Sequence, residues 1–141
     1  LIREQFEKMN DANRDEVIEK AKNDVLEMLK ITIRPEFLNR IDEIIMFTPL
    51  SKKETLKIVE LQIKNVQKLM DSNGIEMQLT TQAMNFLAEK GYDPQFGARP
   101  IKRVIQKLLL NELSKSLIAQ TINREKPIVV EADGERLSFS N

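Results

Sequence analysis

Three cations stand at the start of a predicted helix near the C-terminus, where cations are normally disfavoured. Pro100 suits a first helical position, because its missing N–H would have no partner there, and an apolar run at helical period follows it. Arg99, Lys102 and Arg103 then fall on the first turn, with no acidic residue among them. The positive end of the helix dipole disfavours each such cation by roughly 0.3–1 kcal/mol. A local rule that is broken in this way can mark a functional site.

Two interpretations of these cations remain open. In the first, Arg99 and backbone N–H groups at the helix start bind an anion such as a phosphate. In the second, the helix lies on the surface and its cations pair with Asp93 or Glu89. A second arginine, Arg40, ends a short predicted helix and precedes an apolar run, and a cation at a helix C-terminus is ordinarily favourable.

The composition excludes several classes of chemistry. The 141 residues include no cysteine and no histidine, which removes disulfides, Cys/His zinc sites, cysteine nucleophiles and histidine acid–base catalysis. Lys+Arg and Asp+Glu both number 22, and this balance disfavours a nucleic-acid binder that uses Lys102, Arg103 and Lys107. The sequence contains neither a GxxxxGK[ST] phosphate loop nor a GxSxG nucleophile motif, and we predict no metal site. No apolar run reaches the roughly 20 residues that span a bilayer.

The elements around Arg40 follow from local patterns. Apolar residues at helical period predict a helix from Asp15 to about Leu29. Pro35 disfavours a helical conformation at the residue before it and favours a short helix that reaches Arg40. The β-branched and aromatic run at residues 44–47 predicts a buried strand.

From residue 51 onward the pattern predicts helices and short strands. Ser51 and Glu54 form a capping box for a helix that ends near Gly74. Residues 75–79 alternate strictly between apolar and polar types and predict a half-buried strand. The next helix is expected to be capped by Thr80 or Thr81.

The later part of the chain carries three further signals. Gly91 is expected to close the helix that begins near residue 80, and Tyr92 and Phe96 to anchor the following loop in the core. The apolar face of the helix after Pro100 shifts across residues 109–112, which a kink or two successive helices would explain.

An Asp-Gly pair between two apolar runs predicts a C-terminal hairpin, with its turn at residues 133–135. We therefore expect an α+β fold, with helices packed on a small three- to four-stranded sheet.

Three motifs, in order, resemble the Clp/Hsp100 family of AAA+ ATPases. They are RPEFLNRIDE at residues 34–43, FTPL at residues 47–50 and GYDPQFGARP at residues 91–100. Over nearly all of its length the chain is most similar to the C-terminal end of the second ATPase module of the protein disaggregases in that family. An ATPase subunit of a Clp protease is the alternative within the family. A stand-alone protein-interaction module, built on the helix of residues 56–70, is the alternative outside it.

The resemblance implies a domain organisation and a role for each arginine. Residues 1–42 would be the helical C-terminal tail of the large AAA+ subdomain, and residues 43–141 the small, or lid, subdomain of the Clp D2-small type. Arg99 would be the sensor 2 arginine, which reaches the phosphates of the nucleotide in its own subunit. Its motif also contains Gly97, Ala98 and Pro100, which belong to the same predicted nucleotide site. Arg40 would be the arginine finger, which acts in trans on the nucleotide of a neighbouring subunit.

The same resemblance implies cofactors and partners. The parent protein would bind ATP or ADP with Mg²⁺, assemble as a homo-hexamer, and act in the cytoplasm as a stress-response chaperone. Its substrates would be unfolded or aggregated polypeptides, refolded together with a DnaK-type chaperone system, with no role for nucleic acid or membrane. Because the first residue is Leu1 and the phosphate loop would lie upstream of it, we expect a piece of a longer protein. By itself this piece would neither hydrolyse ATP nor bind it tightly.

Overall fold

The structure is a computed structural model that describes residues 12–141. The first eleven residues of the predicted tail lie outside the described part of the chain. The chain divides into two compact units between Pro49 and Leu50. The sequence places the boundary of the AAA+ subdomains at residues 42 and 43, and the assignment of the two units to those subdomains stays a prediction.

The first unit contains the predicted long helix and the short helix after it. Helix α2 (Arg14–Thr32) carries Asp15 and Glu16 in its first turn and Lys30 in its last, charges that complement the helix dipole. Helix α3 (Pro35–Leu38) begins with Pro35 at its first position, as expected. Ala21 is the one buried residue of α2, so neither helix encloses a core of its own.

The predicted buried strand at residues 44–47 is wrong, because the chain there is neither helix nor strand. Ile45 is 67% exposed and Phe47 is 91% exposed. Apolar β-branched residues favour a strand only when a neighbouring strand pairs with their backbone, and among residues 12–141 none pairs with this segment. The carbonyl of Pro49 instead accepts a hydrogen bond from Nη2 of Arg14 at 3.1 Å.

The second unit begins with helix α4 (Lys52–Ser72), and its predicted capping box is confirmed. The Ser51 N–H donates to Oε2 of Glu54 at 2.7 Å, and the Glu54 N–H donates to Oγ of Ser51 at 3.2 Å. Gly74 follows the helix with φ +73°, the left-handed conformation expected of it. The helix is held at both ends by local chemistry that the sequence shows.

Three short strands form a mixed sheet in the order β1-β2-β3. Strand β1 (Met77–Leu79) runs parallel to β2 (Ile128–Asp133), and β3 (Arg136–Ser140) pairs with β2 in antiparallel fashion. Gly134 has φ +62° in the turn of the predicted hairpin, which is confirmed. Because parallel strands need a long crossover, the remaining helices of this unit lie in sequence between β1 and β2. The sheet completes the predicted α+β fold.

Helix α5 (Thr81–Gly91) is capped by Thr80, whose Oγ1 accepts from the Ala83 N–H at 3.2 Å. A glycine is required at position 91 for a different reason from the one expected. It does not adopt a positive φ, so it is not a left-handed cap. A Cβ added to Gly91 would lie 2.7 Å from Cγ1 and 3.2 Å from Cα of Ile101. The glycine is needed because α5 and the next helix approach each other closely at this point.

The helical run after Pro100 continues as α6 (Ile101–Val104), a π-helical segment η1 (Ile105–Leu110) and α7 (Asn111–Ile118). Its most buried residues recur every four positions; they are Ile101, Ile105, Leu109 and Leu113. An α-helix turns about 100° per residue, so this spacing drifts by roughly 40° at each step. The wider π turn takes up the drift. The helical run is unbroken, so the expected division into two helices is wrong, and the π segment keeps this four-residue series on one buried face through residues 109–112.

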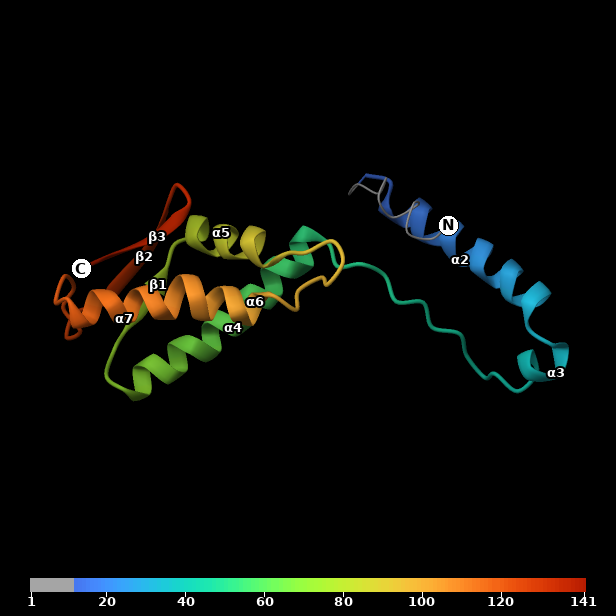
Figure 1. Cartoon of the computed structure of the whole chain (residues 1–141), viewed down its shortest axis with the longest axis horizontal. Helices are drawn as coiled ribbons and strands as arrows, with labels where there is room; N and C mark the ends of the chain where they lie inside the picture. The colour runs from blue at the N-terminus through green and yellow to red at the C-terminus, as the bar shows by residue number, and fades with distance from the viewer. Residues whose placement is uncertain (1–11) are drawn as a thin grey trace. The chain divides into compact units, whose positions relative to one another are not determined.

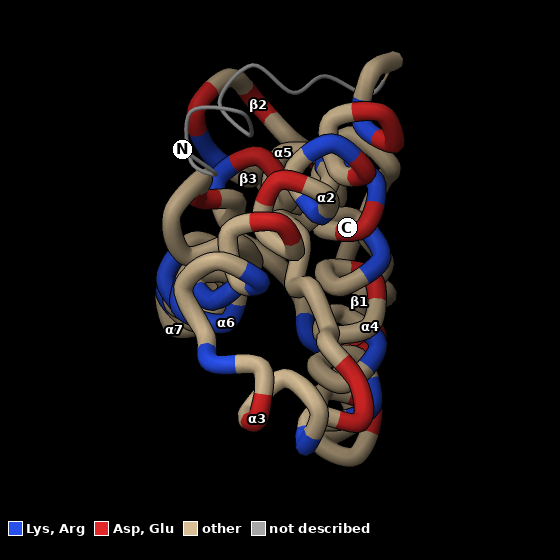
Figure 2. The backbone as a smooth tube through the Cα atoms, turned by 90° about the vertical axis from the view of Figure 1, so that its right-hand side faces the viewer, with Lys and Arg blue, Asp and Glu red and all other residues tan. Residues whose placement is uncertain are grey.

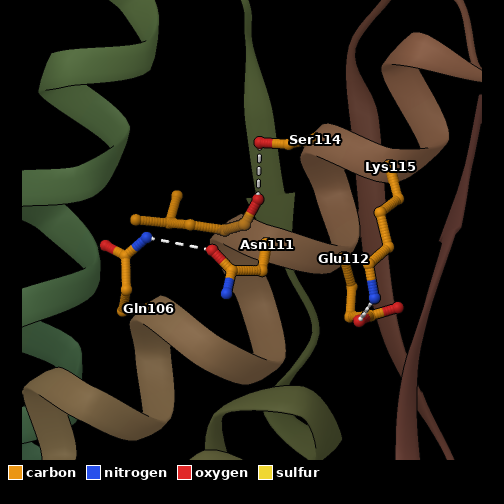
Figure 3. Close-up of polar contacts among 6 residues, drawn as sticks. Gln106, Asn111, Glu112, Ser114 and Lys115 are labelled. Atoms are coloured by element: carbon orange, nitrogen blue, oxygen red, sulfur yellow. Dashed lines mark hydrogen bonds and ion pairs between the residues drawn. The ribbon is translucent and has the colours of Figure 1, made fainter.

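A side-chain hydrogen bond spans the π segment (Figure 3). Nε2 of Gln106 donates to Oδ1 of Asn111 at 3.1 Å, five residues along the chain. Glu112 and Lys115 form an exposed ion pair at 2.7 Å in the following turn. Such an exposed pair contributes little to stability.

The core of the second unit lies between its helices and the sheet (Figure 1). Helix α5 contacts β2, α4 contacts β1, and α7 contacts β3. The fully buried large apolar side chains come from the helical segments of this unit and from the central strand β2; they are Val59, Ile63, Leu87, Ile101, Leu109, Leu113, Ile128 and Val130. This core fixes the position of the loop between α5 and α6, which carries Arg99. None of the described helices is long and apolar enough to cross a membrane.

Candidate functional site

The loop between α5 and α6 is closed by reciprocal hydrogen bonds at its base. The Asp93 N–H donates to the Gly97 carbonyl at 3.0 Å, and the Gly97 N–H donates to the Asp93 carbonyl at 2.7 Å. Oδ1 of Asp93 accepts from the N–H groups of Gln95 at 2.7 Å and Phe96 at 3.0 Å. Gly97 closes the turn with φ +63°, a conformation that a residue with a Cβ rarely adopts. The residues ahead of Arg99 therefore form an ordered turn.

Arg99 follows this turn and is exposed. Its N–H donates to the Phe96 carbonyl at 3.3 Å. Among the described residues its guanidinium forms no hydrogen bond or ion pair, and neither Asp93 nor Glu89 pairs with it. The interpretation in which these carboxylates neutralise Arg99 therefore fails in this structure.

The helix start behind Arg99 keeps its cationic character. Pro100 has helical dihedral angles (φ −68°, ψ −12°) and directly precedes α6, one residue ahead of the helix. The first turn of α6 has no acidic residue, while Lys102 and Arg103 are both exposed. In Figure 2 the tube beside the α6 label carries blue, the colour of Lys and Arg. The positive charges add to one another, so the surface can attract an anion.

Arg40 lies in the first unit and is described separately. It is exposed, two residues beyond the end of α3, and its N–H donates to the Phe37 carbonyl at 3.1 Å. Its guanidinium has no hydrogen bond or ion pair within residues 12–141. Because α3 has only four residues, its aligned peptide dipoles are few. Stabilisation of that helix end is a weak reason for an arginine here.

A cavity of about 390 Å³ opens in the second unit, at the start of the loop between α5 and α6. Leu56, Ala88 and Tyr92 supply apolar surface, and the charged groups at the cavity are Lys52, Lys53 and Glu89. Sequence reasoning did not find it. The only available signal was the small residue Ala88 on the face of α5 that meets α4.

The two aromatic residues of the loop do not both anchor it. Tyr92 is half-buried and lines the cavity, as an anchoring residue would. Phe96 is 56% exposed, so its predicted burial is wrong. Hydrogen bonds to Asp93 and Gly97 hold the turn together, so the turn does not need the Phe96 ring in the core.

With this fold and loop in view, comparison with known proteins gives a family. Residues 50–130 match the family described as the C-terminal, D2-small domain, of ClpB protein. The match covers more than half of the chain, and the chain belongs to this family.

Relatives that match most or all of the chain carry the same name. The chain is similar to the chaperone protein ClpB of Bacteroides thetaiotaomicron, with 55% identity over 140 residues, or 99% of this chain. It is 43% identical to ClpB of Porphyromonas gingivalis over 141 residues, or 100% of this chain. It is also 49% identical to ClpB of Aquifex aeolicus over 118 residues, or 83% of this chain. The chain spans 16% of the length of the first two relatives and 12% of the third.

These matches confirm the resemblance to the Clp family and the fold expected from it. They also favour a ClpB-type chaperone over an ATPase subunit of a Clp protease, because the family and these relatives carry the ClpB name. The roles of Arg99 with Gly97, Ala98 and Pro100, and of Arg40, stay predictions.

Proposed function

We propose that this chain is the C-terminal part of an ATP-dependent protein disaggregase of the ClpB type. In this proposal the second unit is the lid subdomain, which senses bound nucleotide and supports assembly of the hexamer. The single observation that carries it is Arg99: an exposed guanidinium with no partner among the described residues, held behind an ordered turn. The family match supports the same assignment.

The chemistry of the loop fits a phosphate. A guanidinium is planar and permanently charged, and it can donate two parallel hydrogen bonds to phosphate oxygens. Lys102 and Arg103 add positive charge without a competing acid in the turn. Bound ATP with Mg²⁺ would supply the reactive phosphoryl group, and Arg99 would orient it and compensate its charge. Gly97, Ala98 and Pro100 would set the backbone from which Arg99 extends.

The first unit supports the assignment to the large AAA+ subdomain in a different way. Several of its large apolar side chains are exposed; they are Met28 at 50%, Ile31 at 88%, Phe37 at 58%, Ile45 at 67% and Phe47 at 91%. Apolar surface of this extent ordinarily packs against another part of a protein. We propose that the remainder of a large subdomain covers it.

Within that arrangement Arg40 would act in trans. An exposed arginine without a partner in the described chain can reach the nucleotide of a neighbouring subunit. There it would stabilise charge that develops on the transferring phosphoryl group, an effect worth roughly 10³–10⁵ in rate in other phosphoryl-transfer enzymes. The hexamer, the polypeptide substrates, the DnaK-type partner system and the cytoplasmic location belong to this proposal through the resemblance.

A stand-alone interaction module has lost its support. That alternative relied on the apolar seam of α4, but most of the seam belongs to the core of the second unit. The seam consists of Leu56, Val59, Ile63, Val66, Leu69 and Met70. Val59 and Ile63 are fully buried, and Leu56, Val66 and Met70 pack against the same core. Leu69 alone among the seam residues is strongly exposed, at 59%.

The proposal can be tested in a chimera. The matched segment of Bacteroides thetaiotaomicron ClpB is replaced by this chain, and ATP hydrolysis is measured with the first ATPase module inactivated. Arg99→Ala and Arg40→Ala should each lower hydrolysis at least tenfold. Arg136→Ala, which removes an exposed arginine of β3, should change it less than twofold. Parental rates in both test variants would refute the assignment.

A mixing experiment separates the two arginines. Arg40→Ala subunits are mixed with subunits whose own phosphate loop is inactive but whose Arg40 is intact. If Arg40 acts in trans, intact Arg40 side chains serve the competent sites of their neighbours, and hydrolysis rises above the sum of the two separate preparations. The same mixture made with Arg99→Ala should show no such gain, because Arg99 serves its own subunit.

A further inference from the structure

We propose that Asp93 is a positioning residue for Arg99. Its carboxylate holds the turn that precedes Arg99, and so it fixes the direction in which the arginine leaves the chain. The inference rests on the proposed contact between Arg99 and nucleotide, and it adds a residue that acts on nucleotide only through Arg99.

The contacts of Asp93 leave little freedom to the turn. Its Oδ1 accepts two backbone hydrogen bonds at 2.7 and 3.0 Å, from Gln95 and Phe96. Its own backbone N–H and carbonyl pair with Gly97 at 3.0 and 2.7 Å. One half-buried residue therefore makes four hydrogen bonds within its own turn.

The constraint continues from the turn to the arginine. Phe96, whose N–H is held by Asp93, accepts the Arg99 N–H through its carbonyl at 3.3 Å. On the other side, the Ile101 N–H donates to the Ala98 carbonyl at 3.1 Å, and the Ile101 side chain is 1% exposed. Arg99 thus lies between a turn closed by Asp93 and a helix anchored in the core.

The role needs an acceptor oxygen and no negative charge. Asp93 forms no ion pair with Arg99, so its carboxylate is directed at backbone amides. Asparagine has a side-chain oxygen in the same place and forms the same kind of turn. Asp93→Asn should therefore retain the function, whereas Asp93→Ala should lose it. A role that depends on charge predicts that both variants behave alike.

The expected effect has an upper limit set by Arg99 itself. Loss of the two side-chain hydrogen bonds lowers the fraction of molecules in which the turn is closed, and apparent affinity falls in proportion to that fraction. We expect Asp93→Ala to raise the Kd for MgATP about three- to tenfold, with the kcat of bound enzyme changed less than twofold. In a background that carries Arg99→Ala, the same substitution should have no further effect.

The experiment uses the chimera with Bacteroides thetaiotaomicron ClpB and measures MgATP binding and hydrolysis at the second module. The variants are Asp93→Ala, Asp93→Asn, Arg99→Ala and the Asp93→Ala/Arg99→Ala double variant. The expected result is a raised Kd for Asp93→Ala, rescue by Asp93→Asn, and a double variant equal to Arg99→Ala alone. Amide exchange at Gln95 and Phe96, measured in the 141-residue chain, should be faster in Asp93→Ala and restored in Asp93→Asn.

Four results would overturn the inference, and the last of them would overturn the proposed function too. If Asp93→Ala binds MgATP as the parent does while Arg99→Ala binds it weakly, Asp93 has no positioning role and the role of Arg99 stands. Further weakening of the Arg99→Ala variant by Asp93→Ala shows that Asp93 acts on the fold at large. If Asp93→Asn weakens MgATP binding as much as Asp93→Ala does, the effect depends on the negative charge of Asp93 and not on its acceptor oxygen. If Arg99→Ala itself binds MgATP normally, the proposed function fails, and the role of Asp93 fails with it.

Discussion

Gly91→Ala should destabilise the second unit, although alanine is ordinarily the better helix former. Gly91 is the last residue of α5 and has no positive φ, so an alanine there meets no backbone strain. Helix propensity alone would favour the substitution by up to about 1 kcal/mol. The added Cβ, however, would lie 2.7 Å from Cγ1 of Ile101 and 3.2 Å from its Cα.

Those two distances decide whether Gly91→Ala stabilises or destabilises the second unit. Ile101 is 1% exposed and belongs to the core, so its side chain cannot swing away, and one of the two close atoms is backbone. Overpacking of this kind costs about 1–3 kcal/mol. After subtraction of the full propensity gain, we expect a net loss of up to about 2 kcal/mol in the free energy of unfolding.

The assay is urea unfolding of the 141-residue chain. The midpoint should fall while the dependence on denaturant stays unchanged, as for a loss of stability without a change of fold. Gln82→Ala, at an exposed position of the same helix, is the control and should change stability by less than about 0.5 kcal/mol. A Gly91→Ala variant as stable as the parent, or more so, would refute the close approach of α5 and α6.

Two further predictions concern the same unit and the same assay. Thr80→Ala removes the hydroxyl that accepts from the Ala83 N–H at 3.2 Å, and it should lower the free energy of unfolding by about 1 kcal/mol. Thr80→Ser keeps a hydroxyl and should recover most of this loss. Equal stabilities of the Ala and Ser variants would contradict the cap. Leu109→Ala leaves a cavity in place of a side chain that is 0% exposed within the π segment, and it should lower the free energy of unfolding by about 2–5 kcal/mol. Gln106→Ala, at an exposed position of the same segment, should lower it by less than about 1 kcal/mol. Equal losses for Leu109→Ala and Gln106→Ala would contradict the assignment of the buried face.

Features that depend on neighbours in sequence were predicted well. The capping box of Ser51 and Glu54, the left-handed Gly74 and the Asp-Gly hairpin at Gly134 each depend on the chemistry of a few adjacent residues. The cationic start of α6 behind Arg99 could also be read from the sequence, because it requires only the position of Pro100 and the absence of acids.

Features that depend on distant partners were not predicted. Residues 44–47 have the composition of a strand, but the described chain supplies no strand to pair with them. Gly91 was expected to close α5 through its backbone conformation, whereas it is required because Ile101, ten residues away, leaves no room for a Cβ. Phe96 was expected in the core because it is aromatic, yet hydrogen bonds close its turn without the ring.

The π segment was not predicted, although the sequence indicated that the helix after Pro100 is irregular. Its apolar residues lie on one face up to Leu108 and resume at Leu113, which predicted a shift of face across residues 109–112. A kink, a helix break and a π turn all produce such a shift. The choice among them depends on how the helix packs against its neighbours, which include α5 and β3, and this packing is not local information.

The central claim is that the exposed guanidinium of Arg99 binds the phosphates of a nucleotide. Its most direct test is the Kd for MgATP at the second module of the chimera, compared between Arg99→Ala and the control Arg136→Ala. Loss of hydrogen bonds to a charged group predicts a Kd raised roughly ten- to hundredfold for Arg99→Ala, and a Kd close to that of the parent chimera for the control. Equal affinities of the two variants for MgATP would contradict the claim.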